Sequence, residues 1–225
     1  GRDGRGLPRR HPHLPIVPRL CLDFGSKRVE KRGEISAFRS AFRVVFLLFI
    51  TAVLFSTNLG GYDLWPPDEP RFAEVAREML GTGDFLVPRV NGEPYTEKPP
   101  LLFWAIAAVS APFGEVSETT ARIPSVVAAV GTVLCTYFLA ARLYDKRVAL
   151  VSAFVLGTTL RFWIESRTVR TDMLLAACLS AALYAFWRWH ESRQRGCLVA
   201  FYAAITGAVY AKGPPGLLFP ILLVW

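Results

Sequence analysis

Long apolar runs, separated by short clusters of charged residues, make up most of the chain after about residue 40. A helix that crosses about 30 Å of hydrocarbon needs about 20 mainly apolar residues. The pattern therefore predicts an all-α fold, a polytopic membrane helical bundle. The expected spans are residues 41–59, 122–143, 147–165, 173–189, 197–211 and the beginning of another at 217–225.

A shorter apolar run, Leu101–Phe113, decides the expected topology. Runs of about 10–14 residues are more often interfacial or re-entrant than spanning. If this run does not cross, the basic clusters at 142–147 and 188–195 lie inside, and the arginines between 161 and 170 lie outside. The positive-inside rule favours this arrangement over its inverse. We therefore expect an outside loop at 60–121 that carries two surface-lying helices.

Composition divides the chain into two regions. The net charge is +8, and much of the excess lies in residues 1–40, which are rich in Arg, Pro and Gly. Such a segment could bind nucleic acid, but beside a membrane span it fits a disordered cytoplasmic tail better. Residues 41–225 are then the transmembrane domain, and no nucleic-acid partner is expected. The sequence starts at Gly1 and stops within an apolar run, so we expect a fragment.

The four cysteines and three histidines do not form a recognisable metal or disulfide pattern. No cysteine has a CxxC partner, and the histidines do not cluster. The sequence therefore predicts neither a disulfide framework nor a zinc finger.

The first part of the outside loop predicts a helix from Asp68 to Gly81. Apolar residues recur there at helical spacing, which predicts an amphipathic helix able to lie on the membrane surface. Asp68 is expected to cap the helix, and Gly81 to end it. Asp68 and Glu69 then have two interpretations: charges that suit a helix N-terminus, or carboxylates held at a cavity as a general base or metal ligand.

The second part of the loop places a charged pair at a fixed position. Asn91-Gly92 is a strong turn signal, and two prolines follow Glu97 and Lys98. The pair is either an interfacial anchor, or a lysine that meets a lipid phosphate beside a metal-binding glutamate.

Arginines on the expected outside face depart from the positive-inside trend. Arg161, Arg167 and Arg170 could extend towards the interface and pair with Glu165. Alternatively, one of them, Arg170 above all, binds a phosphate.

The motifs together resemble a known family. Pro67 to Glu74, Arg77-Glu78-Met79 and Asn91 to Leu101 look like the lipid A aminoarabinose transferases and their relatives, the protein O-mannosyltransferases, of the multi-span GT-C class. The resemblance continues through 121–125, 170–174 and 211–216, and covers about residues 42–225.

The resemblance implies roles for particular residues. Asp68 and Asp172 match acidic residues at the family's active site, Lys98 matches a lysine that contacts the donor phosphate, and Glu97 matches a metal ligand, with zinc, magnesium or manganese as the candidate ion. The expected donor is a polyprenyl-phosphate sugar, and the acceptor is a lipid A-like molecule or a protein. The expected location is the bacterial inner membrane, with the site facing the periplasm. Further residues expected to bind substrate are Glu69, Arg71, Arg170 and Lys212.

A second hypothesis is a non-catalytic membrane protein, such as a transporter or an assembly subunit. Transporters place ionisable residues near the middle of the membrane. Here the acids lie in the loops and the middles of the spans are almost uncharged. This distribution favours a transferase, in which a carboxylate takes or orients the acceptor proton and cations stabilise the leaving phosphate.

Overall fold

The structure, a computed structural model, describes residues 42–224, and the predicted basic tail lies outside the described residues. Helices account for most of the described chain. The elements in order are an apolar helix at Phe42–Ser56, α2 (Asp68–Thr82), β1 (Arg89–Val90), β2 (Glu93–Pro94), α3 (Leu101–Ser110) with a 3-10 turn at Ala111–Phe113, α4 (Glu118–Leu143), α5 (Lys146–Thr158), α6 (Leu160–Ser166), α7 (Thr171–Ser192), α8 (Arg195–Lys212) and α9 (Pro214–Val224).

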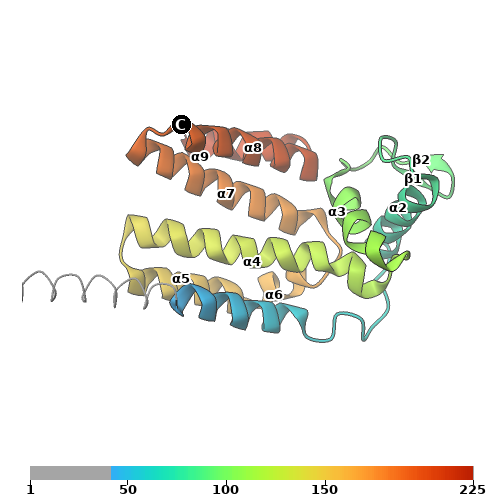
Figure 1. Cartoon of the computed structure of the whole chain (residues 1–225), viewed down its shortest axis with the longest axis horizontal. Helices are drawn as coiled ribbons and strands as arrows, with labels where there is room; N and C mark the ends of the chain where they lie inside the picture. Colours follow the sequence, from blue (N-terminus) through green and yellow to red (C-terminus); the bar gives the residue numbers. More distant parts are fainter. Residues whose placement is uncertain (1–41, 225) are drawn as a thin grey trace, which may run out of the picture. The chain divides into compact units, whose positions relative to one another are not determined.

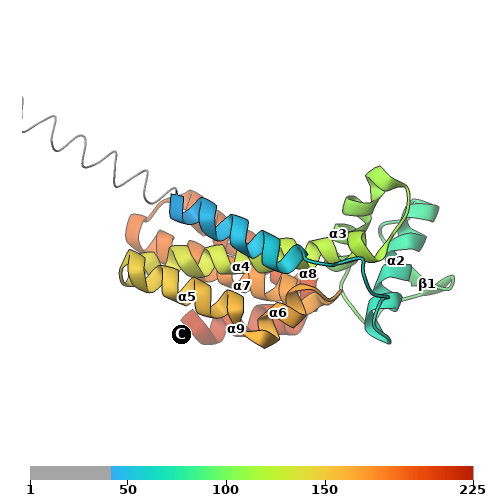
Figure 2. The same ribbon diagram turned by 90° about the horizontal axis from the view of Figure 1, so that it is seen from below.

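The long helices lie side by side, and short turns reverse the chain between them (Figures 1 and 2). Helices α2 and α3 and the small hairpin lie beyond one end of these helices, which we call the loop end. The segments 57–67 and 167–170 and the turn at Gly213 also lie there. The opposite, far end carries the turns at 144–145 and 193–194. Successive turns therefore alternate between the two ends, as the basic clusters predicted, and 142–147 and 188–195 share the far end.

Two groups of buried apolar residues hold the helices together. One lies between the 42–56 helix, α4 and α5, and the other joins α2 and α3 to α7 and α8. Close helix contact depends on small residues: a Cβ at Gly216 would lie 2.3 Å from the backbone carbon of Ala208, so α9 can approach α8 only with glycine there. The largest buried apolar residues of the two groups include Phe55, Val133 and Tyr137 in the first, and Phe72, Met79, Phe103 and Ile106 in the second.

The helix from Asp68 was predicted correctly, but its environment differs from the prediction. The helix continues to Thr82, and Gly83, with a left-handed φ of 73°, ends it in place of Gly81. Its apolar face is buried in protein, and the ring of Phe72 lies 5.8 Å from that of Phe103 in α3. The expectation that this face lies on the membrane surface is therefore wrong, because α3 covers it.

The remaining loop predictions agree better with the structure. Asn91 and Gly92 have φ angles of 54° and 79°, which is the conformation of a two-residue hairpin turn, and they join β1 to β2. The short apolar run forms α3, which at 1.5 Å per residue spans about 15 Å, about half of a hydrocarbon core. That α3 does not cross the bilayer stays a prediction.

Length and composition single out few helices as membrane spans. Between residues 42 and 224, α4 alone is long and apolar enough for a crossing, and α5 with α6 adds a second only when the pair is counted as one span. That pair is bent by 67°, so two helices with a break at Thr159 occupy the span expected at 147–165, and whether the pair crosses as one span stays a prediction. The hydroxyls of Thr158 and Thr159 donate to the carbonyls of Phe154 and Val155, a bonding pattern that often bends helices. The other expected spans are helices whose crossing stays a prediction.

Candidate active site

Asp68 begins α2 without capping it. The residue at the cap position is Pro67, and no side chain accepts a capping hydrogen bond there, so the predicted capping role is wrong. The Asp68 carboxylate is 40% exposed, and its Oδ2 lies 3.8 Å from Nη2 of Arg170. Asp68 is therefore a carboxylate that makes no capping hydrogen bond in its own helix and lies beside a cation from a distant part of the chain.

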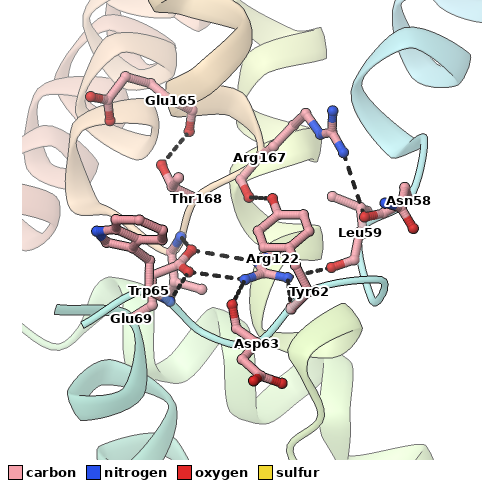
Figure 3. A network of polar contacts seen from close by, with 11 residues as sticks. Asn58, Leu59, Tyr62, Asp63, Trp65, Glu69, Arg122, Glu165, Arg167 and Thr168 are labelled. Atoms are coloured by element: carbon pink, nitrogen blue, oxygen red, sulfur yellow. Dashed lines mark hydrogen bonds and ion pairs between the residues drawn. The ribbon is translucent and has the colours of Figure 1, made fainter. Parts of the chain in front are cut away.

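Glu69, the next residue, is in the opposite situation. It is 2% exposed, and its Oε2 lies 3.0 Å from Nη2 of Arg122, which is fully buried (Figure 3). The backbone N–H of Trp65 donates to Oε2 at 2.7 Å, and that of Val169 donates to Oε1 at 2.6 Å. These contacts occupy the carboxylate, and they favour a structural role for Glu69 over the predicted substrate binding.

Arg122 completes this buried network from the first turns of α4. Its guanidinium lies 3.8 Å from the ring centre of Tyr62 and donates to the carbonyl of Tyr62 at 3.0 Å, to that of Asp63 at 2.9 Å, and to that of Leu59 (Figure 3). The segment 59–65, the start of α2 and the backbone beside Arg170 are thus tied together by the Arg122–Glu69 pair. The position of Asp68 relative to Arg170 follows from this network.

Sequence reasoning did not assign a role to Arg122. The available signal was an arginine near the start of an apolar helix, which must find an acidic or carbonyl partner if it is buried. The partner, Glu69, lies 53 positions earlier in the chain. No local pattern connects the two.

A cavity of about 420 Å³ opens beside Asp68 at the loop end. It lies between the 62–69 segment and the region from α6 to Arg170. Its lining combines aromatic rings with charges of both signs: Tyr62, Trp65 and Trp163, the acids Asp68 and Glu165, and Arg161, Arg167 and Arg170.

The charges around the cavity form a row. Arg161 Nη2 lies 2.5 Å from Glu165 Oε1, Arg170 lies 4.0 Å from that same oxygen, and Arg170 then reaches Asp68. The predicted pairing with Glu165 is confirmed for Arg161 and Arg170. Arg167 differs, since its guanidinium lies 4.5 Å from the ring centre of Trp163 and donates to backbone carbonyls of residues 57 and 58.

Asp172 and Lys212 form a second charged group at the loop end. Asp172 lies in the first turn of α7 and pairs with Lys212, the last residue of α8. Gly213 follows with a φ of 75°, and a Cβ placed on it would lie 3.9 Å from the Pro99 ring. The pair is therefore adjacent to the segment that carries Glu97 and Lys98.

Glu97 is an exposed carboxylate whose contacts are with Arg71 and Tyr95. Its Oε2 lies 3.4 Å from Arg71 Nη1, and the Tyr95 hydroxyl donates to it at 3.3 Å. Burial raises the pKa of Tyr95, so this hydroxyl keeps its proton at neutral pH. Lys98, half-buried, makes no hydrogen bond or ion pair with the described residues, and so its charge remains available.

The predicted metal site is not assembled in the described part of the chain. No group of three or more His, Cys, Asp or Glu side chains suited to a metal occurs between residues 42 and 224. Glu97, exposed and paired with Arg71, is one carboxylate without a second metal-binding neighbour there. These residues alone do not fit a metal ion.

Comparison with known proteins places this arrangement in a family. The sequence model of the dolichyl-phosphate-mannose-protein mannosyltransferases matches residues 97–225, more than half of the chain. The chain belongs to this family. The match confirms the resemblance inferred from the loop motifs.

Relatives with named activities support the same assignment. The chain is 33% identical over 187 residues to the undecaprenyl phosphate-alpha-4-amino-4-deoxy-L-arabinose arabinosyl transferase of Shewanella sediminis, which covers 80% of this chain and 33% of the relative. The chain spans about a quarter to a third of the length of such relatives.

Solved structures show the fold of the family. ArnT from Cupriavidus metallidurans, bound to undecaprenyl phosphate, superposes with a TM-score of 0.75 at 28% identity, over 80% of this chain and 34% of that one. The oligosaccharyltransferase AglB from Archaeoglobus fulgidus, in complex with an inhibitory peptide and a dolichol-phosphate, gives 0.59 at 19% identity, over 83% and 25%. The latter shares the fold alone. Both agree with the predicted GT-C fold.

Proposed function

We propose that the full-length protein containing this chain is an integral membrane glycosyltransferase. It would move a sugar from a polyprenyl-phosphate donor to a lipid A-like or protein acceptor. The observation that carries the proposal is the contrast at the start of α2, where Glu69 is fixed in a buried ion pair and its neighbour Asp68 is held free beside a cavity and Arg170.

The proposed chemistry assigns Asp68 to the acceptor. An acceptor hydroxyl attacks the anomeric carbon of the sugar while the carboxylate takes or orients its proton. The bond from that carbon to the phosphate oxygen breaks, and the polyprenyl phosphate leaves with the electron pair. Cations stabilise the charge that develops on the phosphate.

The loop end supplies these cations. Lys98 has no partner among the described residues, and Arg170 lies next to Asp68. Lys212, adjacent to the Pro99 segment, is paired with Asp172, which would orient its ammonium group towards the same region. Arg71 holds Glu97 beside Lys98.

We further propose that the long helices form a polytopic bundle and that the loop end faces the outside, the periplasm of a bacterial inner membrane. Support comes from the basic clusters at the far end, which fit a cytoplasmic surface. Single cysteines at 68, 212 and 147 in spheroplasts test this proposal. Labelling of 68 and 212 by an impermeant reagent is expected, with 147 protected. Labelling of residue 68 only after permeabilisation would show that the loop end faces the cytoplasm, which is the opposite topology.

A divalent metal ion held at Glu97 would add positive charge beside the leaving phosphate. An oligosaccharyltransferase with this fold, from Archaeoglobus fulgidus, has been solved in complex with zinc and sulfate. Glu97 is the residue that the family resemblance assigns to a metal. Among residues 42–224, Glu97 would supply one ligand to such an ion.

Mutation of Asp68 tests the catalytic proposal. Asp68→Asn in the full-length protein should lower kcat by roughly 10²–10⁴-fold at saturating donor, because general-base assistance is worth that much. Glu74→Gln is the matched control, since Glu74 lies on the same helix and pairs with Arg77 at the surface. Near-normal turnover of Asp68→Asn would remove Asp68 from the reaction.

A further inference from the structure

We propose that the cavity beside Asp68 binds the glycosyl phosphate of the donor and that Glu165 selects its sugar by accepting a hydrogen bond from a ring hydroxyl. This inference rests on the proposed function and adds a sugar-recognition residue to it. It also assigns the class of sugar, which is uncharged.

The first observation is an unsatisfied acceptor. The Glu165 side chain is 12% exposed, and Oε1 takes both ion pairs, with Arg161 and Arg170. The other oxygen, Oε2, is buried and has no hydrogen-bond partner. A buried acceptor without a partner is unfavourable, and a sugar hydroxyl that donated a hydrogen bond to it would remove much of that cost.

The second observation is the shape and composition of the cavity. Its volume of about 420 Å³ falls within the roughly 300–1,000 Å³ of small-ligand pockets. Such pockets combine apolar and aromatic walls with a few polar groups that fix orientation. Here Tyr62, Trp65 and Trp163 supply the rings. Trp65 is 73% exposed, so its ring is free to cover one face of a sugar.

The third observation is the charge balance of the lining. Arg161, Arg167 and Arg170 face two carboxylates, Asp68 and Glu165, while Glu69 is already neutralised by Arg122. The excess is one positive charge. A sugar with a phosphate complements this balance, whereas an ammonium group on the ring would add to the excess. The cavity therefore favours a neutral hydroxylated sugar next to the phosphate.

Position links this cavity to the proposed reaction. Arg170 lies between Glu165 and Asp68, at 4.0 Å and 3.8 Å. A phosphate held at Arg170 would place the sugar between the oxygen that recognises it and the carboxylate that serves the acceptor. Glu165 would thus act on the sugar, and Asp68 on the incoming hydroxyl.

Donor binding without an acceptor tests the proposal. The probes are bare polyprenyl phosphate and polyprenyl-phosphate-glucose, titrated into the full-length protein in detergent. In the parent protein, the glucose lipid should bind more tightly than the bare lipid. Glu165→Leu should lower affinity for the glucose lipid by about tenfold or more, because a hydrogen bond to a charged group is lost. Affinity for bare polyprenyl phosphate should change by less than about threefold.

Two further variants separate the explanations. Trp65→Ala should reduce the same sugar-dependent gain without disturbing any ion pair. Glu191→Leu is the matched control, because Glu191 also bonds an arginine and a tryptophan but lies at the far end. It should leave both affinities unchanged.

Each alternative outcome is decisive. Equal losses for the two lipids in Glu165→Leu would mean that Glu165 only holds the arginines, and the inference fails. Unchanged affinity for both would remove the sugar from this cavity. If the parent protein bound neither lipid, the proposed function itself would fail, which is a separate result. A parent protein that preferred the 4-amino-arabinose lipid to the glucose lipid would overturn the assignment of an uncharged sugar.

Discussion

The two ends of the helical bundle both carry arginines and acids, but they use them differently. At the far end, Glu191 pairs with Arg142 and accepts from Trp187 at 2.8 Å, while Asp145 caps α5. Each of these far-end carboxylates has a local structural task. At the loop end, Glu69 has such a task, whereas Asp68 makes only a long ion pair with Arg170 and one oxygen of Glu165 has no hydrogen-bond partner.

The difference shows what marks a functional cluster in this fold. Charge alone does not distinguish the ends, because arginines are numerous at both. The distinguishing feature is carboxylate oxygens that remain without a structural hydrogen bond, on residues that line a cavity. The predictions below test this distinction by removing equivalent groups from each end.

The largest expected effect on stability comes from breaking the buried ion pair between Glu69 and Arg122. Glu69→Gln or Arg122→Met should lower the free energy of unfolding by about 3–5 kcal/mol, because the remaining charge stays buried without its partner. Glu191→Gln at the far end should have little effect, since that pair is partly exposed. Thermal or denaturant unfolding of the full-length protein in detergent measures both.

Equally small losses of unfolding free energy in the loop-end variants and in Glu191→Gln would contradict this prediction. The double variant Glu69→Leu, Arg122→Met provides a control. It should be more stable than either single variant, because no isolated charge is left in the interior.

An intermediate effect is expected from Lys212. Lys212→Met should weaken the binding of polyprenyl phosphate by about tenfold or more, since a charged hydrogen bond to phosphate is lost. Arg195→Met, at the other end of the same helix, should leave affinity unchanged. Isothermal titration in detergent compares them, and equal behaviour of the two variants would exclude Lys212 from the phosphate site.

Much of the fold could be predicted from the sequence because it depends on local patterns. Apolar runs located the long helices, Asn91-Gly92 located the hairpin turn, and the spacing of the basic clusters predicted that 142–147 and 188–195 share one end. Boundaries were less certain: Gly81 and Gly83 are both suitable helix ends, and the three-dimensional path of the chain selects Gly83. The bend at Thr159 lies two residues after Gly157, and a single glycine within an apolar run does not by itself predict a break in the helix.

The site was less predictable because it depends on contacts between residues that lie far apart in the sequence. Asp68 and Glu69 are adjacent acids with the same local signal, yet one is buried and the other free. What separates them is Arg122, together with the Val169 N–H, which lies 100 positions away. The same applies to Glu165, whose partners could be suggested from sequence but whose unsatisfied oxygen could not. The sequence identified Arg161, Arg167 and Arg170 as candidates, but it could not predict the cavity that they line.

The smallest expected effect distinguishes the two ends by their helix caps. Ser117 caps α4 at the loop end with a hydroxyl, whereas Asp145 caps α5 at the far end with a carboxylate that accepts from Val148 at 2.9 Å and from Arg147 at 2.6 Å. These backbone bonds, that from Val148 first, lower the pKa of Asp145 below its ordinary value of 3.8. A lowered folded-state pKa means that the cap contributes fully above that ordinary value and is lost as the pH falls through the folded value.

Asp145→Ser should therefore match the parent protein near pH 7, since serine and aspartate cap about equally well. As the pH falls below the ordinary value of 3.8, the parent should lose slightly more thermal stability than Asp145→Ser, because a hydroxyl cap does not titrate. Ser117→Asp is the reciprocal variant and should introduce the same acid sensitivity at the loop end. Melting temperatures in detergent across this pH range measure the difference. Parallel curves for the parent and Asp145→Ser would show that the carboxylate does not hold the far-end turn, and the contrast between the two caps would then be lost.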